Sequence, residues 1–117
     1  MLIKIDPSSE EPLFSQIAAA IREQVAAGSA TAGTKLPAAK LLASQLDVNL
    51  HTVLRAYQEL RDQGLIELRR GRGATVTGQA EGLQELTDTV DTLIAEAKRL
   101  GVGTDALVSL VKVRSTA

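Results

Sequence analysis

The sequence predicts an α+β fold that is mostly helical. Three observations support this fold class. Residues 36–57 have the pattern of two short helices joined by a tight turn, and residues 65–77 have that of a β-hairpin. After Gly78 the apolar residues recur at heptad spacing. We therefore expect a small helical domain with one hairpin, followed by a C-terminal helical tail.

Composition narrows the class of protein. The 117 residues suffice for one domain, or for one domain with a short appendage, and 44% hydrophobic with 2% aromatic residues implies an aliphatic core. The absence of cysteine excludes disulfides and thiolate metal sites, and fits a reducing cytoplasm. The first residues lack a charged region followed by a long apolar run, so we expect that they are not a signal peptide. No apolar run approaches the length of a membrane span. We expect a cytoplasmic protein that needs no metal or other cofactor and does not enter a membrane.

The formal net charge of −1 hides an uneven distribution. Residues 34–78 contain seven Lys/Arg against four Asp/Glu, whereas residues 79–117 contain four against six. A weak net charge is compatible with nucleic-acid binding when the basic residues share one face.

The N-terminal half predicts two helices. Residues 2–5 alternate briefly, as in a short edge strand or a frayed terminus. Residues 12–27 keep helical apolar spacing, with a proline in the first turn and Gly28 as the stop. A second helix is expected over 38–46. Lys40 lies near its start, where it could meet a phosphate or remain a solvated surface lysine.

A third helix is expected over residues 50–63. Asn49 suits its N-cap, and Val48 and Val53 have the spacing of a hydrophobic staple. One face of this helix is apolar and consists of Val53, Ala56, Tyr57 and Leu60. The opposite face carries His51, Arg55, Gln58 and Asp62, with Thr52 at its edge. Such a helix suits insertion into a DNA major groove, although an ordinary amphipathic helical hairpin has the same pattern.

Residues 65–68 and 74–77 are expected to pair around a basic turn at 69–73. The turn contains three arginines, which repel one another and which a turn does not require. Phosphate or minor-groove contact is their natural use, and the glycines permit close backbone approach; simple solvation is the alternative. A glycine-rich nucleotide loop is a weak alternative, because no strand leads through these glycines into a helix with a Lys-Ser/Thr signature.

The tail carries a heptad seam that either packs on the first helix or pairs two copies of the chain. Its length favours self-association. A glycine-containing stretch at 101–103 ends this helix, and a short helix follows. The seam, which is the expected dimerisation surface, consists of Leu83, Leu86, Val90, Leu93, Ala97 and Leu100.

A series of short motifs runs through residues 12–76, each weak alone but specific in this order and spacing. They are Pro12-Leu13-Phe14, Gln16-Ile17, Gly28, Gly33, Leu36-Pro37, Leu42-Ala43, Val48-Asn49, Thr52-Val53, Arg55-Ala56-Tyr57, Leu60, Gly64-Leu65-Ile66 and Arg70-Gly71-Arg72-Gly73. With these residues the chain resembles the GntR family of bacterial transcription regulators, and most of all its small YtrA-type branch.

The resemblance implies a winged helix-turn-helix over 1–78 that binds double-stranded operator DNA, and a helical dimerisation region over 79–117. A homodimeric repressor is expected. The expected DNA-binding residues are Lys40, Asn49, Leu50, His51, Thr52, Arg55, Arg70, Gly71 and Arg72. Lys40 replaces the usual arginine, and Leu50 replaces an arginine or proline, so the operator cannot be inferred from relatives.

Several alternatives stay open. Arg55 could pair with Glu59 four residues on instead of meeting a phosphate, and Asn49 could serve only as a cap. The basic hairpin could dock an acidic protein, which would make the chain an interaction module. A small-molecule effector is also left open. An enzyme is not expected, because His51 is the single histidine and has no nucleophile motif or second metal ligand beside it.

Overall fold

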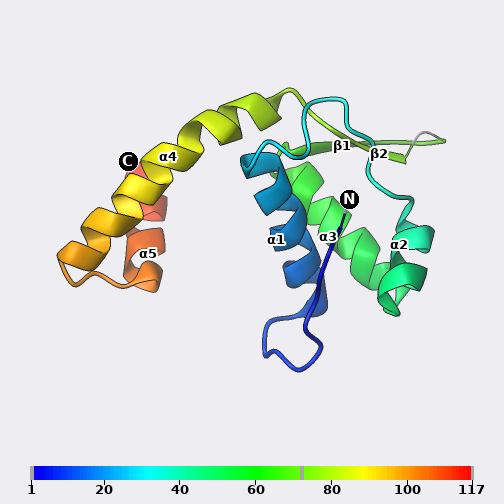
Figure 1. Ribbon diagram of the computed structural model, residues 1–117, viewed down its shortest axis with the longest axis horizontal. Coiled ribbons are helices and arrows are strands. Elements are labelled where there is room, and N and C mark those ends of the chain that lie inside the picture. The colour runs from blue at the N-terminus through cyan, green and yellow to red at the C-terminus, as the bar shows by residue number, and fades with distance from the viewer. Residues whose placement is uncertain (1, 72, 117) are drawn as a thin grey trace. The chain divides into compact units, whose positions relative to one another are not determined.

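The computed structural model describes residues 2–71 and 73–116 (Figure 1). The elements are α1 (Leu13–Ala26), α2 (Ala39–Leu46), α3 (Leu50–Asp62), β1 (Ile66–Arg69), β2 (Gly73–Val76), α4 (Gln79–Arg99) and α5 (Thr104–Ser115). The predicted α+β, mostly helical class is confirmed, and the bounds of α1 to β2 agree with the prediction to within one residue. The chain divides into two compact units, Met1–Gln84 and Glu85–Ala117.

The core of the first unit lies between α1 and α3. Ile17, Ile21 and Val25 of α1 are completely buried, as are Val53 and Leu60 of α3. Each large aliphatic side chain removed from water in this way contributes roughly 1.5–3 kcal/mol to folding. The helical spacing in the sequence identified this apolar face of α3 correctly. The core therefore holds one side of α3 and leaves the other side free.

A left-handed residue makes the turn from α2 to α3 tight. Asp47 has φ 53°. Its N–H donates to the carbonyl of Ser44 (3.3 Å), and the Val48 N–H donates to that of Ala43 (3.0 Å). This hydrogen-bond pattern is the Schellman motif that ends many helices. Val48 is half-buried against the core to which Val53 also belongs, as the predicted staple requires.

The segment that precedes Asp6 is neither the strand nor the frayed end that its sequence suggested. Ile3 is buried in the core. The side-chain amide of Gln24 donates to the carbonyl of Leu2 (2.7 Å). Gln16 accepts from the Asp6 N–H (2.7 Å) and donates to the Asp6 carbonyl (3.0 Å). Glutamine side chains on α1 thus supply hydrogen bonds that a neighbouring strand would otherwise have supplied.

The hairpin is antiparallel, with Ile66 opposite Val76. A third extended segment, not foreseen from the sequence, pairs with β2. The Leu36 N–H donates to the carbonyl of Ala74, and the Val76 N–H donates to that of Thr34, both at 2.9 Å. The lead-in to α2 is therefore attached to the hairpin, so the hairpin and the helix-turn-helix belong to one packed unit.

The predicted seam runs along α4, but its residues have different surroundings. Leu83 packs against the core of the first unit and Ala97 is buried. The other four side chains, Leu86, Val90, Leu93 and Leu100, are 42–61% exposed. None of the side chains described in α5 is buried. The chain alone therefore leaves most of the seam uncovered. None of the helices that the structure describes combines the length and hydropathy that a membrane crossing requires.

Candidate nucleic-acid interface

The start of α3 is fixed by its cap. The Asn49 side-chain oxygen accepts from the His51 N–H at 2.8 Å, which confirms the predicted capping role. His51 is exposed, Leu50 is 39% exposed and Thr52 is half-buried. The first turn of α3 therefore presents one aliphatic and two hydrogen-bonding side chains on the side away from the core.

Arg55 lies one turn further along this face of α3. Its guanidinium carbon stands 3.8 Å from the ring centroid of Phe14 in α1, which is a cation–π contact. Phe14 is half-buried and packs against the core. The contact holds the middle of the exposed face of α3 against α1.

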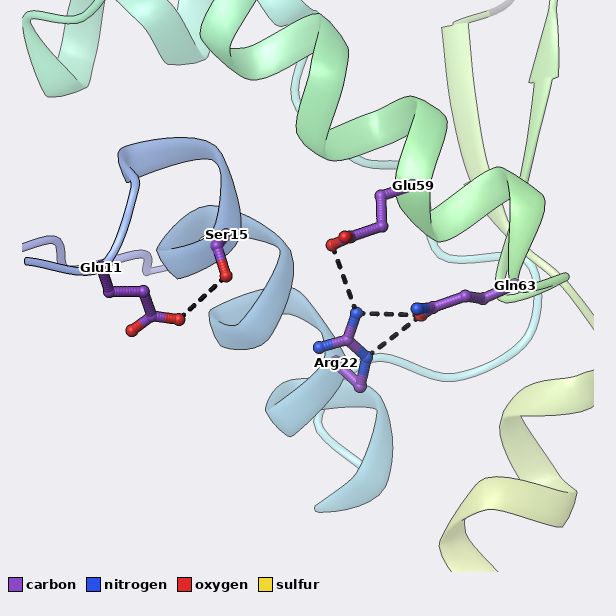
Figure 2. Close-up of polar contacts among 5 residues, drawn as sticks. All are labelled: Glu11, Ser15, Arg22, Glu59 and Gln63. Atoms are coloured by element: carbon purple, nitrogen blue, oxygen red, sulfur yellow. Dashed lines mark hydrogen bonds and ion pairs between the residues drawn. The ribbon is translucent and has the colours of Figure 1, made fainter. Parts of the chain in front are cut away.

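The expected alternative for Arg55, an ion pair with Glu59, is not formed. Glu59 instead lies 3.6 Å from the guanidinium of Arg22 in α1. Arg22 also donates twice to the side-chain oxygen of Gln63, at 2.9 and 3.2 Å, so that it spans Glu59 and Gln63 (Figure 2). Arg22 of the neighbouring helix therefore pairs with Glu59, the carboxylate that was the alternative partner of Arg55.

Tyr57 secures α3 from its buried side. Its hydroxyl donates to the carbonyl of Pro37 at 2.7 Å, and burial raises the pKa of Tyr57 to about 12. Sequence reasoning placed Tyr57 on the apolar face but missed this bond. A signal was available, because a buried tyrosine hydroxyl usually finds a hydrogen-bond partner. The contact ties α3 to the segment that enters α2, where Lys40 is exposed.

The tip of the hairpin differs in one respect from the prediction. Arg69 lies within β1 and pairs with Glu67 at 2.9 Å, so it is not an unpaired cation of the turn. Arg70 and Gly71 are exposed, and Gly71 has φ 79°, a conformation that glycine adopts readily. Arg72, the third predicted residue of the tip, lies outside the described residues.

The exposed basic side chains predicted to contact DNA come from three elements of the first unit. Lys40 belongs to α2, Arg55 to α3 and Arg70 to the hairpin turn, and all three are exposed. Within residues 2–71 and 73–116, no group of three or more histidine, aspartate or glutamate side chains could hold a metal ion. The chemistry that the arrangement offers is hydrogen bonding and attraction of anions.

Comparison with known proteins gives a consistent result. The model of the GntR family, described as bacterial regulatory proteins, matches residues 13–76. The HTH-type transcriptional repressor YtrA of Bacillus subtilis (strain 168) is 34% identical over 95% of this chain and 90% of its own length. A solved YtrA from Sulfolobus acidocaldarius, a GntR-family transcription factor, is 35% identical and superimposes with a TM-score of 0.64, covering 85% of this chain and 99% of its own.

A further solved structure, AraR(DBD) in complex with an operator, is 28% identical, has a TM-score of 0.57 and covers 64% of this chain and 93% of its own. The family model matches more than half of the chain, and the identity to the Bacillus repressor extends along nearly all of it. The chain therefore belongs to the GntR family of bacterial regulatory proteins.

Proposed function

We propose that this protein is a sequence-specific, homodimeric DNA-binding repressor of the YtrA type that acts in the cytoplasm. The observation that carries the proposal is the exposed polar face of α3. This face begins at Asn49, which caps the helix, and the core anchors the helix along its other side. Membership of the GntR family and the operator complex of a structural relative support the same function.

In the proposed mechanism, α3 of each subunit enters one major groove. His51 and Thr52 meet base edges or the adjacent backbone, and Leu50 can contact a thymine methyl group. The side-chain oxygen of Asn49 already accepts the His51 N–H, so a contact between Asn49 and a base is a secondary part of the proposal. The short side chains of this first turn suit close approach to the groove floor.

Phosphate contacts would surround the first turn of α3. Lys40, Arg55 and Arg70 are exposed cations on three elements, and Arg72 together with Gly71 would extend the contact at the wing. Such contacts release counterions and make the affinity fall steeply with salt. They would set the register of the protein on the duplex, while the first turn of α3 supplies the sequence preference.

Dimerisation is proposed for the region 79–117, with residues 1–78 as the DNA-binding domain. The support is the uncovered aliphatic seam, in which Leu86 is 57% and Leu100 is 61% exposed. A second copy would remove these side chains from water. Pairing would also set the two recognition helices about one DNA turn apart, roughly 34–36 Å. A ligand that changed this spacing would regulate binding.

The test is fluorescence anisotropy with duplexes tiling the region upstream of the protein's own gene, at two salt concentrations and with scrambled competitor DNA. Tight binding to one near-palindromic duplex that survives the competitor is expected. Binding to every duplex that disappears with salt would reduce the interface to a nonspecific basic surface. If no duplex binds even at low salt, the proposal is wrong, and the basic hairpin becomes a candidate surface for an acidic protein partner.

A further inference from the structure

Arg55 is held in a way that leaves its hydrogen-bonding edge available. The ring of Phe14 lies against the flat face of the guanidinium, 3.8 Å from centroid to carbon. The five N–H donors of a guanidinium lie in its plane and point away from a stacked ring. Stacking therefore restricts the rotamers of Arg55 without using the donors that a phosphate would need.

The acids that could neutralise Arg55 are engaged elsewhere. Glu59, four residues further along α3, lies at the usual spacing for an ion pair but is held by Arg22. Asp62, one turn beyond, lies 3.4 Å from Arg61. In the described part of the chain, Arg55 has no ion pair.

Arg22 is itself held by hydrogen bonds to a neutral side chain as well as by its ion pair. Its two donations to the Gln63 oxygen orient the guanidinium next to Glu59, as Figure 2 shows. The pair is partly exposed, with side chains 35% and 38% accessible, so its direct effect on stability is small. The consequence of this pair for Arg55 is larger, because Arg22 keeps the Glu59 carboxylate away from the Arg55 guanidinium.

We infer that Phe14 and Arg22 of α1 are positioning residues that present Arg55 to a DNA phosphate. Phe14 orients the guanidinium, and Arg22 withholds Glu59 from it. The inference rests on the proposed DNA-binding function and extends it to two side chains that touch no DNA themselves. Helix α1 would then contribute to the affinity of α3 for DNA, in addition to packing against α3 in the core.

The test is a double-mutant cycle measured on the protein's best operator duplex, with affinity recorded across a range of KCl concentrations. Arg55→Ala should weaken binding about tenfold and lower the slope of log affinity against log salt by about one, the effect of a lost phosphate contact. Phe14→Leu keeps an apolar side chain of similar size against the core. It should weaken binding about threefold through loss of the stacking surface.

Arg22→Gln should also weaken binding about threefold, because Glu59 is then free to pair with Arg55. In a Glu59→Gln background the same change should have almost no effect. A purely structural role for Arg22 would lower affinity equally in both backgrounds. Arg61→Gln is the matched control, since it removes one charge from α3 and should show no dependence on Glu59.

The outcomes separate this inference from the proposed function. If the parent protein binds its operator but the effects of Arg22→Gln and Glu59→Gln are additive, the positioning role of Arg22 is wrong and the function stands. An unchanged affinity and salt slope for Phe14→Leu would likewise remove the role of Phe14. If the parent protein binds no DNA at all, the proposed function and this inference both fail. Urea unfolding of each variant verifies that it is folded under the binding conditions.

Discussion

The hydroxyl of Tyr57 makes the stability of the fold sensitive to high pH. Burial raises the pKa of Tyr57 from 10.0 to about 12. The neutral form is favoured in the folded state, so this stabilisation is complete below about pH 10 and is lost as the pH rises towards 12. A rise in pKa of this size corresponds to about 3 kcal/mol. Urea unfolding between pH 9 and 12 should therefore show stability falling as the pH rises.

Tyr57→Phe provides the control for that titration. The variant loses the hydrogen bond to the carbonyl of Pro37, so it should be about 1 kcal/mol less stable at pH 7. It should also lose the part of the alkaline decline that Tyr57 causes. If parent and variant decline in parallel above pH 10, other groups account for the pH dependence.

The two roles suggested for Asn49 can be separated by substitution. Asn49→Ala removes the oxygen that accepts the His51 N–H, and should lower the free energy of unfolding by about 1 kcal/mol. Asn49→Ser retains a capping oxygen and should be nearly as stable as the parent. Operator affinity then reports on the second role. If Asn49→Ser keeps the full affinity, the side chain serves as a cap; a selective loss of affinity would indicate a base contact.

At the scale of elements, the hairpin is expected to bind phosphate without reading sequence. Replacing Arg70 and Arg72 together with alanine should weaken binding to operator and scrambled DNA alike, and lower the salt slope by about two. Anisotropy at several salt concentrations measures both quantities. Arg69→Ala is a matched control, because Arg69 already pairs with Glu67 and should matter less. An unaltered slope in the double variant would exclude the wing from the phosphate contacts.

The elements themselves were largely predictable. Apolar spacing located α1, α2 and α3, and Asn49 marked the start of α3 because capping depends on residues only two or three positions apart. The pairing of residues 34–36 with β2 was not predictable. Its hydrogen bonds join backbone groups distant in sequence, and a backbone group carries no side-chain signature of its partner.

At the scale of the whole molecule, the uncovered seam predicts that DNA binding depends on self-association. Replacing Leu86 and Leu93 with aspartate places two charges in the proposed interface, where they would be desolvated without partners. We expect monomers in sedimentation velocity, and operator affinity at least about tenfold weaker, because each monomer contacts one half-site. Both residues are more than 40% exposed in the single chain, so the substitutions should leave the first unit folded.

The matched control places the same charges on the exposed side of α4 away from the seam. Thr92→Asp with Ala95→Asp adds two carboxylates to the helix without entering the heptad positions. This variant should remain dimeric. Dimers in the Leu86 and Leu93 variant would show that the heptad interpretation is wrong, whereas monomers in both variants would indicate a general effect of charge on α4.

The amino-acid sequence alone shows which segments are helical, which face of α3 is polar, where this helix begins and which family the chain resembles. The first three properties depend on local spacing, and every residue needed for each of them lies within one or two turns. The family follows from the order of short motifs along residues 12–76. The partners of the charged side chains of α1 and α3 follow instead from how these two helices pack. Arg55 lies on Phe14 rather than beside Glu59, because α1 packs against α3 and brings Arg22 to that carboxylate. Sequence spacing shows which side chains of one helix can pair with each other. It does not show when a side chain from another helix, such as Arg22, takes the place of such a partner.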